Sequence, residues 1–453
     1  MLHRARRVLA IWVGKILISA ARLLGKRGSA TPGQVALRIA PDLLRELAAQ
    51  VRRGVIAVCG ANGKTTTNNI ICDLLQAKGY PTVGNRLGAN MLSGVVTAFV
   101  DAAKLSGGLE ADYACIEVDE LWAVRVFEHF KPNYLVMTNL FRDQLDRYGA
   151  VAITLDALKR AAATSDGATL ILNADDPLLA GIGRQYSGQC VSYGVAQEPP
   201  ELNPAPAAVG PGEGGLCPSC GGALHYAAYY YSHIGRYACP ECGFARPTPE
   251  YAATRVDLSQ GLAFAVDGTQ IKVNYRGFYN IYNFLAAYAV VRQCGLAPAE
   301  ISELLADFKP QLGRMESFNL GQRQVILNLA KNPAGFNQSL VALLADKRAK
   351  TVLIAVNDQE SDGRDISWLW DVDFERLRGE ARVIASGARA HEIRLRMKYA
   401  GFDPAQVRLE PGLSPALAAA LADESQVVYA LVNYTALFLT HDLLSKMAEG
   451  QSG

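Results

Sequence analysis

The stretch GVIAVCGANGKTT, which runs from Gly54 to Thr66, decides the fold of this chain. Its first half is a short apolar run bounded by glycine, as expected of a buried parallel strand. A glycine-containing turn follows, and Thr65–Lys78 then repeats apolar residues with the spacing of a helix. A strand, a glycine turn and a helix in this order predict a phosphate-binding loop. Glycines admit phosphate oxygens to backbone N–H groups, and the helix N-terminus adds partial positive charge.

The side chains of this loop have separate predicted roles. Lys64 would reach the β- and γ-phosphates of a nucleotide, and the hydroxyl of Thr65 or Thr66 would hold Mg²⁺. The strict pattern G-x-x-x-x-G-K-[ST] is not met, because Val58 stands where its first glycine would be. The shorter form G-x-N-G-K-T is itself distinctive. We expect ATP to be bound by Gly60, Asn62, Gly63, Lys64, Thr65 and Thr66.

The bulk composition limits the class of protein. The chain has 453 residues, 50% hydrophobic and 19% charged, which predicts a globular protein of two or three domains. Its 45 lysines and arginines nearly balance its 43 acidic residues, so the overall charge does not favour binding to a polyanion. We therefore expect no nucleic-acid partner. The nine cysteines are odd in number and several lie in apolar stretches, which indicates a reducing, cytoplasmic compartment rather than a disulfide framework.

Strand-like and helical stretches alternate along the chain. Apolar runs after the loop include Tyr113–Val118, Tyr134–Thr138 and Thr169–Leu172, with a helical segment at Val151–Thr164 between them. This alternation predicts an α/β fold with a mostly parallel sheet, followed by a second, Rossmann-like α/β unit. We expect three parts, residues 1–50, 51–311 and 312–453.

The N-terminal residues 1–28 combine early arginines with interrupted apolar runs. Lys15 and Arg22 break these runs into stretches well below the roughly 18–20 residues that a spanning helix needs. Two interpretations stay open: a basic amphipathic helix on the inner surface of the membrane, or a helix that packs on the body of the protein. We therefore expect a cytoplasmic protein, peripheral at the inner face of the cell membrane under the first interpretation.

Four cysteines form two close pairs, Cys217/Cys220 and Cys239/Cys242, in a segment of about residues 213–247. Two C-x-x-C pairs at this separation are typical of a zinc ribbon, in which four thiolates complete a tetrahedral site. Because protein ligands fill all four positions, the zinc would be structural. His225 and His233 lie between the pairs, and we expect neither to bind the ion.

Several motifs resemble those of the Mur ligase family, over most of residues 50–450. The loop GANGKTT is similar to the family's G-T-N-G-K-T, and TNLFRDQLDRYG at Thr138–Gly149 is similar to its T-N-x-x-x-D-H-L-D segment. The resemblance implies a P-loop central domain that uses ATP and Mg²⁺. It also implies that Glu117, in IEVDE, binds Mg²⁺ together with Thr65.

The same resemblance extends the nucleotide site to residues far along the chain. NIYNFLAA is similar to a family motif that would bring Asn280 and Asn283 to the nucleotide, and GRME is similar to one that contributes Arg314. Two positions depart from amino-acid-adding Mur ligases: Gln144 replaces a histidine, and Asn328–Pro333 reads NLAKNP where those enzymes have D-Y-A-H-N-P. These departures put the addition of an amino acid in doubt.

A zinc ribbon within such an ATP-binding domain resembles one branch of the family, MurT, whose members amidate the peptide stem of lipid II. The segment DGRDISWLWD at Asp362–Asp371 is similar to the C-terminal signature of this branch. By that resemblance Asp365 would be the catalytic aspartate that orients or deprotonates ammonia, and Asp358 or Asp362 could take its role. Without the resemblance, the same residues predict an acidic solvated loop.

The resemblance implies amidation of the D-glutamate α-carboxylate of lipid II, at the membrane surface, to D-isoglutamine through an acyl-phosphate. Lys64, Glu117 and Asp365 would be catalytic, with ATP, Mg²⁺ and Zn²⁺ as cofactors. No isolated cysteine stands in a G-x-C-x-G turn, so ammonia would come from a partner, which the resemblance implies to be a GatD-type glutaminase forming a heterodimer.

Two other functions remain open at this point. An amino-acid-adding ligase of the Mur or folylpolyglutamate type would accept amino acids instead of ammonium. A nucleic-acid-stimulated NTPase that grips its partner with the ribbon would need a basic patch, which the charge balance does not favour.

Overall fold

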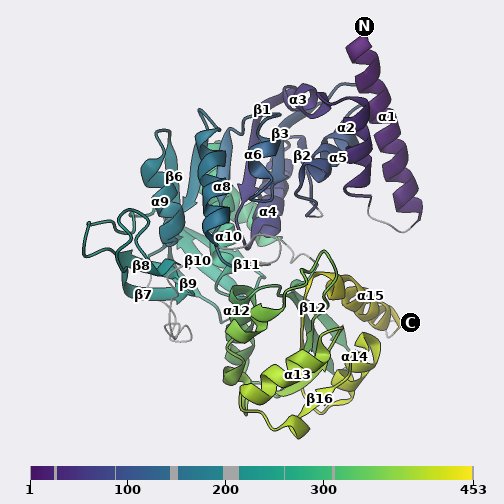
Figure 1. Ribbon diagram of the computed structural model, residues 1–453, viewed down its shortest axis with the longest axis vertical. Helices are drawn as coiled ribbons and strands as arrows, with labels where there is room; N and C mark the ends of the chain where they lie inside the picture. The colour runs from purple at the N-terminus through teal and green to yellow at the C-terminus, as the bar shows by residue number, and fades with distance from the viewer. Residues whose placement is uncertain are drawn as a thin grey trace.

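The computed structural model describes residues 2–24, 28–86, 88–142, 151–196, 214–259, 261–308 and 312–450. Within these ranges the chain builds a nine-stranded sheet, a six-stranded sheet and a two-stranded hairpin. Figure 1 shows the larger sheet in the upper part of the view, and the smaller sheet with its helices below it. The prediction of an α/β fold with mostly parallel sheets is confirmed.

The larger sheet has the strand order β11-β10-β9-β6-β5-β4-β1-β3-β2. Pairing is parallel from β2 across to β9 and antiparallel at the edge formed by β10 and β11. Its strands are β1 (Val51–Cys59), β2 (Thr82–Gly84), β3 (Ala111–Glu117), β4 (Tyr134–Met137), β5 (Thr169–Asn173), β6 (Cys190–Val195), β9 (Tyr251–Asp257), β10 (Leu262–Val266) and β11 (Thr269–Val273).

Helices cover both faces of this sheet because successive side chains of its central strand point to opposite sides. Ile56 and Val58 of β1 belong to the apolar core beneath α4 and α10, whereas Val55 and Ala57 belong to the core beneath α5 and α8. The helices are α2 (Thr31–Ile39), α3 (Leu43–Ala48), α4 (Lys64–Ala77), α5 (Leu92–Ala102), α6 (Ala123–Val126), α8 (Val151–Ala163), α9 (Pro177–Gln185), α10 (Asn280–Gln293) and α11 (Pro298–Ala306).

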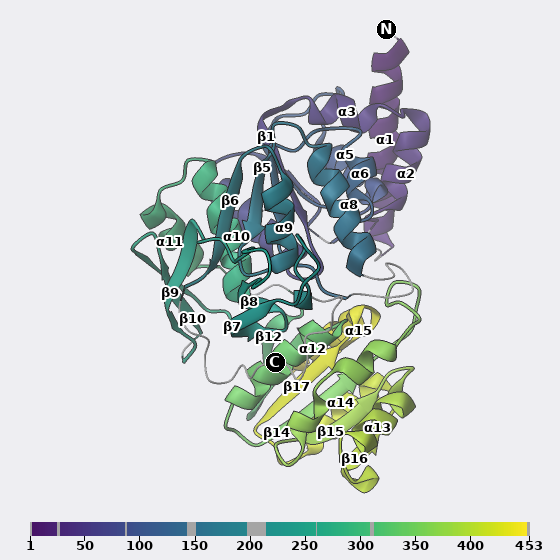
Figure 2. The ribbon, with the colours of Figure 1, turned by 60° about the vertical axis from the view of Figure 1, so that its left-hand side comes forward.

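The smaller sheet has the order β12-β13-β17-β14-β15-β16, with β12 antiparallel at one edge and the other strands parallel. Helices again lie on both faces (Figure 2). Its elements are β12 (Arg314–Leu320), β13 (Arg323–Leu329), α12 (Pro333–Ala345), β14 (Lys350–Ala355), η2 (Ser367–Asp371), η3 (Phe374–Leu377), β15 (Arg382–Ser386), α13 (Ala390–Tyr399), η4 (Pro404–Gln406), β16 (Val407–Leu409), α14 (Leu413–Ala422), β17 (Val427–Val432) and α15 (Tyr434–Gly450).

Two elements stand outside this layered plan. The hairpin of β7 (His225–Tyr231) and β8 (Ile234–Ala238) carries the cysteine module, and the helix α1 (Leu2–Leu23) lies at the N-terminal edge. Among the described helices, none combines the length and the apolar character needed to cross a membrane.

The strand β1 begins earlier than its apolar pattern predicts. It starts at Val51 and includes the exposed Arg52 and Arg53, which lie within a register shift against β3. Arg52 lies 2.9 Å from the carboxylate of Asp112. Polar residues at the exposed start of an otherwise buried strand hide that start from a hydrophobic pattern.

β1 lies between β3 on one side and β4 on the other, and the chain visits these neighbours in turn. In an open parallel sheet, such a reversal of strand order leaves a crevice at the carboxyl ends of the strands, where ligands bind. The turn Gly60–Gly63 lies at that end of β1.

Candidate functional site

The turn between β1 and α4 is possible only with glycine at two positions. Gly60 has φ +127° and Gly63, the N-cap of α4, has φ +82°. A Cβ at Gly60 would lie 2.2 Å from Thr138 Oγ1, and one at Gly63 would lie 2.0 Å from Asn283 Oδ1. At both positions glycine allows a positive φ and a close approach of neighbouring atoms that a side chain would prevent. The turn presents the N-terminus of α4 to the crevice.

Lys64 is buried at the start of α4 and its ammonium group lies inside the turn. Lys64 Nζ donates to the carbonyl of Gly60 at 2.5 Å and to Glu120 Oε1 at 2.7 Å. The amide of Gly60 donates to the same carboxylate oxygen at 2.8 Å. Burial raises the pKa of Glu120, and the charge of Lys64 opposes that rise. Two donors that could bind a phosphate thus converge on one carboxylate.

Thr65 and Glu117 lie side by side at the mouth of the same crevice. Thr65 Oγ1 donates to Glu117 Oε2 at 2.8 Å, and Asn90 Nδ2 donates to Glu117 Oε1 at 2.9 Å. The backbone of Glu117 is held in turn by both side-chain atoms of Asn85. Adjacent oxygen ligands of an octahedral Mg²⁺ lie about 3 Å apart, so this pair fits the donor set and spacing of such an ion.

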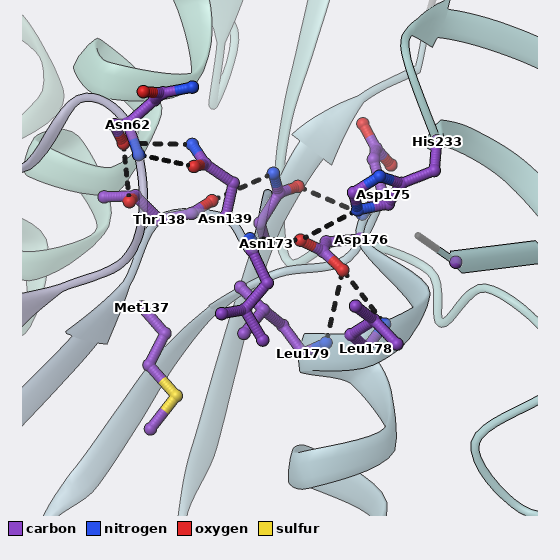
Figure 3. Close-up of polar contacts among 12 residues, drawn as sticks. Asn62, Met137, Thr138, Asn139, Asn173, Asp175, Asp176, Leu178, Leu179 and His233 are labelled. Atoms are coloured by element: carbon purple, nitrogen blue, oxygen red, sulfur yellow. Dashed lines mark hydrogen bonds and ion pairs between the residues drawn. The ribbon is translucent and has the colours of Figure 1, made fainter. Parts of the chain in front are cut away.

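The turn is anchored from below by the ends of two neighbouring strands (Figure 3). Asn139 Oδ1 accepts from the amide of Asn62 at 2.8 Å, and the carbonyl of Asn62 accepts from Thr138 Oγ1 at 2.8 Å and from Asn139 Nδ2 at 3.0 Å. Asn173, at the end of β5, donates to the carbonyl of Thr138 at 3.2 Å. These bonds fix the backbone of the phosphate-binding turn in one conformation.

A narrow cleft of about 50 Å³ separates the turn from the smaller sheet. Asn62 and Asn332 bridge it with two side-chain hydrogen bonds of 3.3 and 2.9 Å, and Asn332 also caps the N-terminus of α12. A wider cavity of about 770 Å³ adjoins it along α12, and Gln338 lines both. The narrow cleft is lined by, among others, Asn62, Gly63, Thr66, Tyr231, Asn280, Asn283, Arg314, Lys331 and Asn332. Every residue expected to reach the nucleotide from α10 or β12 is therefore found beside the turn.

The acidic loop after β14 distinguishes its three aspartates. Asp362 is buried, and its carboxylate accepts from the amide and the hydroxyl of Thr435 at 2.8 and 2.5 Å. Asp358 pairs with Arg389 at 2.9 Å. Asp365 is partly exposed, and the amide of Ser367 donates to it at 2.7 Å, which lowers its pKa. Of the three, Asp365 is the carboxylate whose contacts leave it open to a ligand.

This loop also touches the body of the larger sheet. The backbone amide of Leu140, just after β4, donates to the carboxylate of Asp176. Two residues further on, Arg142 forms an ion pair with Asp371 at the end of η2. The charge of Arg142 also lowers the pKa of Asp365. Asp365 therefore lies on a loop that is joined by an ion pair to the segment following β4.

The four cysteines of the module come together as their spacing predicts. Cys217 Sγ lies 3.6 Å from Cys242 Sγ, Cys220 Sγ lies 3.5 Å from Cys239 Sγ, and all four sulfurs lie within 4.8 Å of one another. Sulfurs around a tetrahedral zinc at 2.3 Å would be about 3.8 Å apart. The cluster therefore fits a structural Zn²⁺ site. His225 and His233 are not part of it.

The segment that follows the second cysteine pair is tied to the larger sheet through a buried carboxylate. Asp175 lies 2.5 Å from Arg246 Nε and accepts from Tyr282 OH at 2.8 Å. Burial raises the pKa of Asp175, and Arg246 opposes that rise. The buried ring of His233 lies 3.6 Å from the carboxylate of the neighbouring Asp176 (Figure 3).

Comparison with known proteins gives a family match within each of the two sheet-containing parts of the chain. A family model of the Mur ligase middle domain matches residues 58–206, and a model of the MurT ligase C-terminal domain matches residues 329–437. The chain is 35% identical over 447 residues to a subunit MurT of lipid II isoglutaminyl synthase (glutamine-hydrolyzing) from Staphylococcus aureus, covering 98% of this chain and 99% of the relative. The chain belongs to the MurT branch of the Mur ligase family.

Solved structures agree with the fold of this chain. A pseudomurein peptide ligase type C from Methanothermus fervidus superposes with a TM-score of 0.69 at 23% identity, over 90% of this chain and 81% of that one. A MurF ligase from Thermotoga maritima in complex with ADP superposes with a TM-score of 0.63 at 15% identity, over 92% and 85%.

Of the two departures from amino-acid-adding ligases, the structure describes one. Gln144 lies outside the described residues. Asn328, at the end of β13, accepts from the amide of Met315 at 3.1 Å and donates to Ser339 Oγ at 2.7 Å. Met315 has φ +55° beside a register shift in β12, so Asn328 supports the strained backbone that positions Arg314.

Three residues of the site were not predicted from the sequence. Glu120 holds Lys64, Asn332 bridges to the turn, and Tyr231 of the cysteine module lines the cleft. Glu120 stands in the same IEVDE motif as Glu117, and Asn332 stands in NLAKNP, so motif proximity could have indicated both. No local signal marks Tyr231, because its position depends on where the module packs.

Proposed function

We propose that this chain is the ATP-dependent synthetase subunit that amidates the D-glutamate α-carboxylate of the lipid II stem peptide to D-isoglutamine. The observation that carries the proposal is the placement of Lys64, Thr65 and Glu117 together at the turn after β1, in a chain related along 98% of its length to a named lipid II isoglutaminyl synthase subunit. The MurF neighbour with bound ADP supports ATP as the nucleotide.

The first half-reaction transfers a phosphoryl group to the substrate. A carboxylate oxygen of the D-glutamyl residue attacks the γ-phosphorus of ATP, the bond from that phosphorus to the β–γ bridging oxygen breaks, and ADP leaves. The amides of the Gly60–Gly63 turn and the ammonium of Lys64 would bind the phosphates, so catalysis here is positioning and charge stabilisation.

The second half-reaction forms the amide. The nitrogen of ammonia attacks the acyl carbon, the bond from that carbon to the phosphate oxygen breaks, and inorganic phosphate leaves with its electron pair. Asp365 would accept the proton that the nitrogen loses, or would orient the incoming ammonia. Its lowered pKa keeps it ionised, and therefore able to accept a proton or a hydrogen bond, at neutral pH.

Two metal ions would support this function. Thr65 and Glu117 would hold Mg²⁺, which when bound would neutralise charge on the phosphates. Cys217, Cys220, Cys239 and Cys242 would hold Zn²⁺, with no open position for substrate.

Nucleotide binding also requires the two sheets to separate. Pockets for ligands of this size measure about 300–1,000 Å³, far more than the cleft of about 50 Å³ at the turn. The hydrogen bonds between Asn62 and Asn332 would break when the smaller sheet moves away from the loop.

The ammonia would come from a second chain. The Staphylococcus aureus relative is named as a subunit of a glutamine-hydrolyzing enzyme, and the word subunit implies that this relative has a partner. We propose a GatD-type glutaminase as the partner of this chain, in a heterodimer. Because its substrate is lipid-linked, we place the complex in the cytoplasm at the inner face of the membrane.

A direct experiment separates this proposal from an amino-acid-adding ligase. Lipid II would be incubated with ATP, Mg²⁺ and either ammonium or a panel of amino acids, and the product would be weighed by mass spectrometry. Conversion of acid to amide with ammonium, a loss of about one mass unit, supports the proposal. Addition of an amino acid residue, or no ammonium-dependent change, contradicts it.

A further inference from the structure

The helix α1 has two apolar faces, and only one of them is covered by the protein. Ala10, Ile11 and Ile18 are buried against α2 and α5. Packing there is close, since a Cβ at Gly14 would lie 2.7 Å from Val100 Cγ1. In both ribbon views α1 lies along the outer edge of the molecule beside α2 (Figures 1 and 2).

Polar contacts fix the rotation of α1 about its axis. Lys15 Nζ donates to the carbonyl of Asp101 at 2.6 Å, and Arg22 pairs with the carboxylate of Asp101 at 2.8 Å. Arg7 pairs with Glu46 at 3.0 Å near the other end of the helix. The opposite face of α1 is therefore held toward solvent along its length.

That outer face carries a stripe of large apolar side chains. Leu9, Trp12, Ile16 and Leu23 are 54%, 50%, 64% and 88% exposed. Their spacing of three, four and seven residues places them on one side of a helix. Leu105, itself 57% exposed, extends the stripe, because its carbonyl accepts the indole N–H of Trp12 at 2.8 Å. Contiguous exposed apolar surface of this kind marks an interaction site.

The charge of the helix indicates what this face meets. Residues 2–24 contain His3, Arg4, Arg6, Arg7, Lys15 and Arg22, and no aspartate or glutamate. His3, Arg4 and Arg6 are exposed in the first turns. A surface with an apolar stripe, an indole whose N–H points to a carbonyl, and the exposed arginines Arg4 and Arg6 complements anionic lipid headgroups above acyl chains.

We propose that the outer face of α1 is a membrane-docking surface, on which the helix lies in the plane of an anionic phospholipid bilayer. The stripe would enter the boundary between headgroups and acyl chains, and Arg4 and Arg6 would contact the lipid phosphates. The helix would not cross the bilayer, since no described helix is suited to do so. The inference rests on the proposed function in one respect: a lipid-linked substrate gives the docking its purpose.

The test uses the full chain and vesicles of known composition. Binding would be measured by co-sedimentation with vesicles of phosphatidylglycerol mixed with phosphatidylcholine, and with vesicles of phosphatidylcholine alone. We expect binding to the anionic vesicles that weakens as salt is raised. The double variant Leu9→Glu, Ile16→Glu should bind about a hundredfold more weakly. Leu439→Glu is the matched control, since Leu439 is 54% exposed on α15, and it should bind like the parent.

Several results would overturn the proposal. The parent chain could fail to bind anionic vesicles, or the double variant could bind as well as the parent. Analytical ultracentrifugation without lipid could show a dimer that the double variant abolishes, which would make the stripe a contact between two copies. Amidation of detergent-dispersed lipid II separates this outcome from the proposed function. The double variant should amidate detergent-dispersed lipid II as well as the parent does. If the parent binds vesicles but does not amidate lipid II, the proposed function is contradicted and the docking surface is not.

Discussion

Lys64 and Glu120 form a buried ion pair in the phosphate-binding turn, with 2.7 Å between Nζ and Oε1. The carboxylate oxygen that accepts from Lys64 also accepts the amide of Gly60. A phosphate would need the same two donors. Nucleotide binding therefore brings the negative charge of the phosphates next to a carboxylate whose pKa is already raised by burial.

The first prediction concerns Lys64 itself. The variant Lys64→Ala removes the only ammonium group among the described residues that lies within the turn, so we expect ATP turnover to fall by roughly 10²–10³-fold. Release of ADP in the presence of lipid II and ammonium measures it. Lys78→Ala, in an exposed pair with Glu300, is the control and should behave like the parent. Full turnover by Lys64→Ala would remove the basis of the proposed function.

The second prediction concerns the pH dependence that Glu120 imposes. Because its pKa is raised, Glu120 is protonated over a pH range in which an exposed glutamate is ionised, and it becomes charged as the pH rises through the raised value. The carboxylate then repels the phosphates, so ATP should bind more weakly to the parent on the alkaline side. Glu120→Gln should lack this component.

Titration calorimetry at several pH values measures the difference between the two chains. The titration of the nucleotide itself is common to both and cancels. The ratio of the two dissociation constants should therefore change with pH in the direction of weaker parent binding at higher pH. A ratio that stays constant would show that Glu120 does not oppose the nucleotide.

The local part of this site could be predicted from the sequence, whereas its long-range members Asn280, Asn283 and Arg314 could be predicted only through the family resemblance. The turn was predictable because a strand, glycines and a helix follow one another within a few residues. Glu117 and Thr65 came from motifs. The contact of Glu120 with Lys64 depends on the register that pairs Val58 with Glu117, and a single sequence does not contain that register.

The acidic loop and the cysteine module show the same limit. The resemblance puts Asp365 ahead of Asp358 and Asp362 without a physical reason for the order. The structure supplies one for Asp362, which is bonded to Thr435, more than seventy residues away in the chain. The four cysteines were predictable from spacing alone, whereas the placement of Tyr231 in the cleft depends on how the module packs on the larger sheet.

The third prediction separates the aspartates by function. Asp365→Asn keeps the size of the side chain and removes its charge, so amide formation should fall by roughly 10²–10⁴-fold while ATP binding stays unchanged. Asp362→Asn should act differently. It weakens the contact with Thr435 at the start of α15, so we expect a lower thermal midpoint. Equal losses of amidation and stability in both variants would contradict the assignment of Asp365.

The fourth prediction joins the cysteine module to the nucleotide. Tyr231→Ala removes a ring from the wall of the cleft, where it packs 5.5 Å from Tyr282, so the affinity for ATP should fall roughly tenfold. Tyr231→Phe should restore it, because the ring is kept. Tyr229→Ala removes a ring from the same strand that does not line the cleft, and it serves as the control.

Removal of the metal also tests whether the cysteine module contributes to nucleotide binding. Chelation of zinc should loosen β7 and β8 and weaken ATP binding by a similar factor, with the loss of zinc followed by elemental analysis. Unchanged affinity in the metal-depleted chain, while Tyr231→Ala binds weakly, would show that packing alone holds the hairpin.

The fifth prediction concerns the buried pair of Asp175 and Arg246. Arg246→Met leaves the carboxylate of Asp175 buried with hydrogen bonds but without its counter-ion, which should cost about 3–5 kcal/mol of unfolding free energy. The double variant Asp175→Asn, Arg246→Met removes the charge and should recover part of this loss. Denaturant unfolding followed by the fluorescence of the tyrosine-rich module measures both.

The pH dependence of this loss follows from the same pair. Burial raises the pKa of Asp175 and Arg246 lowers it, so removing Arg246 raises that pKa further. A raised carboxyl pKa favours the folded state while the group is protonated, and this advantage is lost as the pH rises through the folded-state value. The stability deficit of Arg246→Met should therefore shrink at acidic pH and grow toward neutral pH. A deficit independent of pH would mean that lost packing of the arginine side chain, rather than the uncompensated carboxylate, causes it.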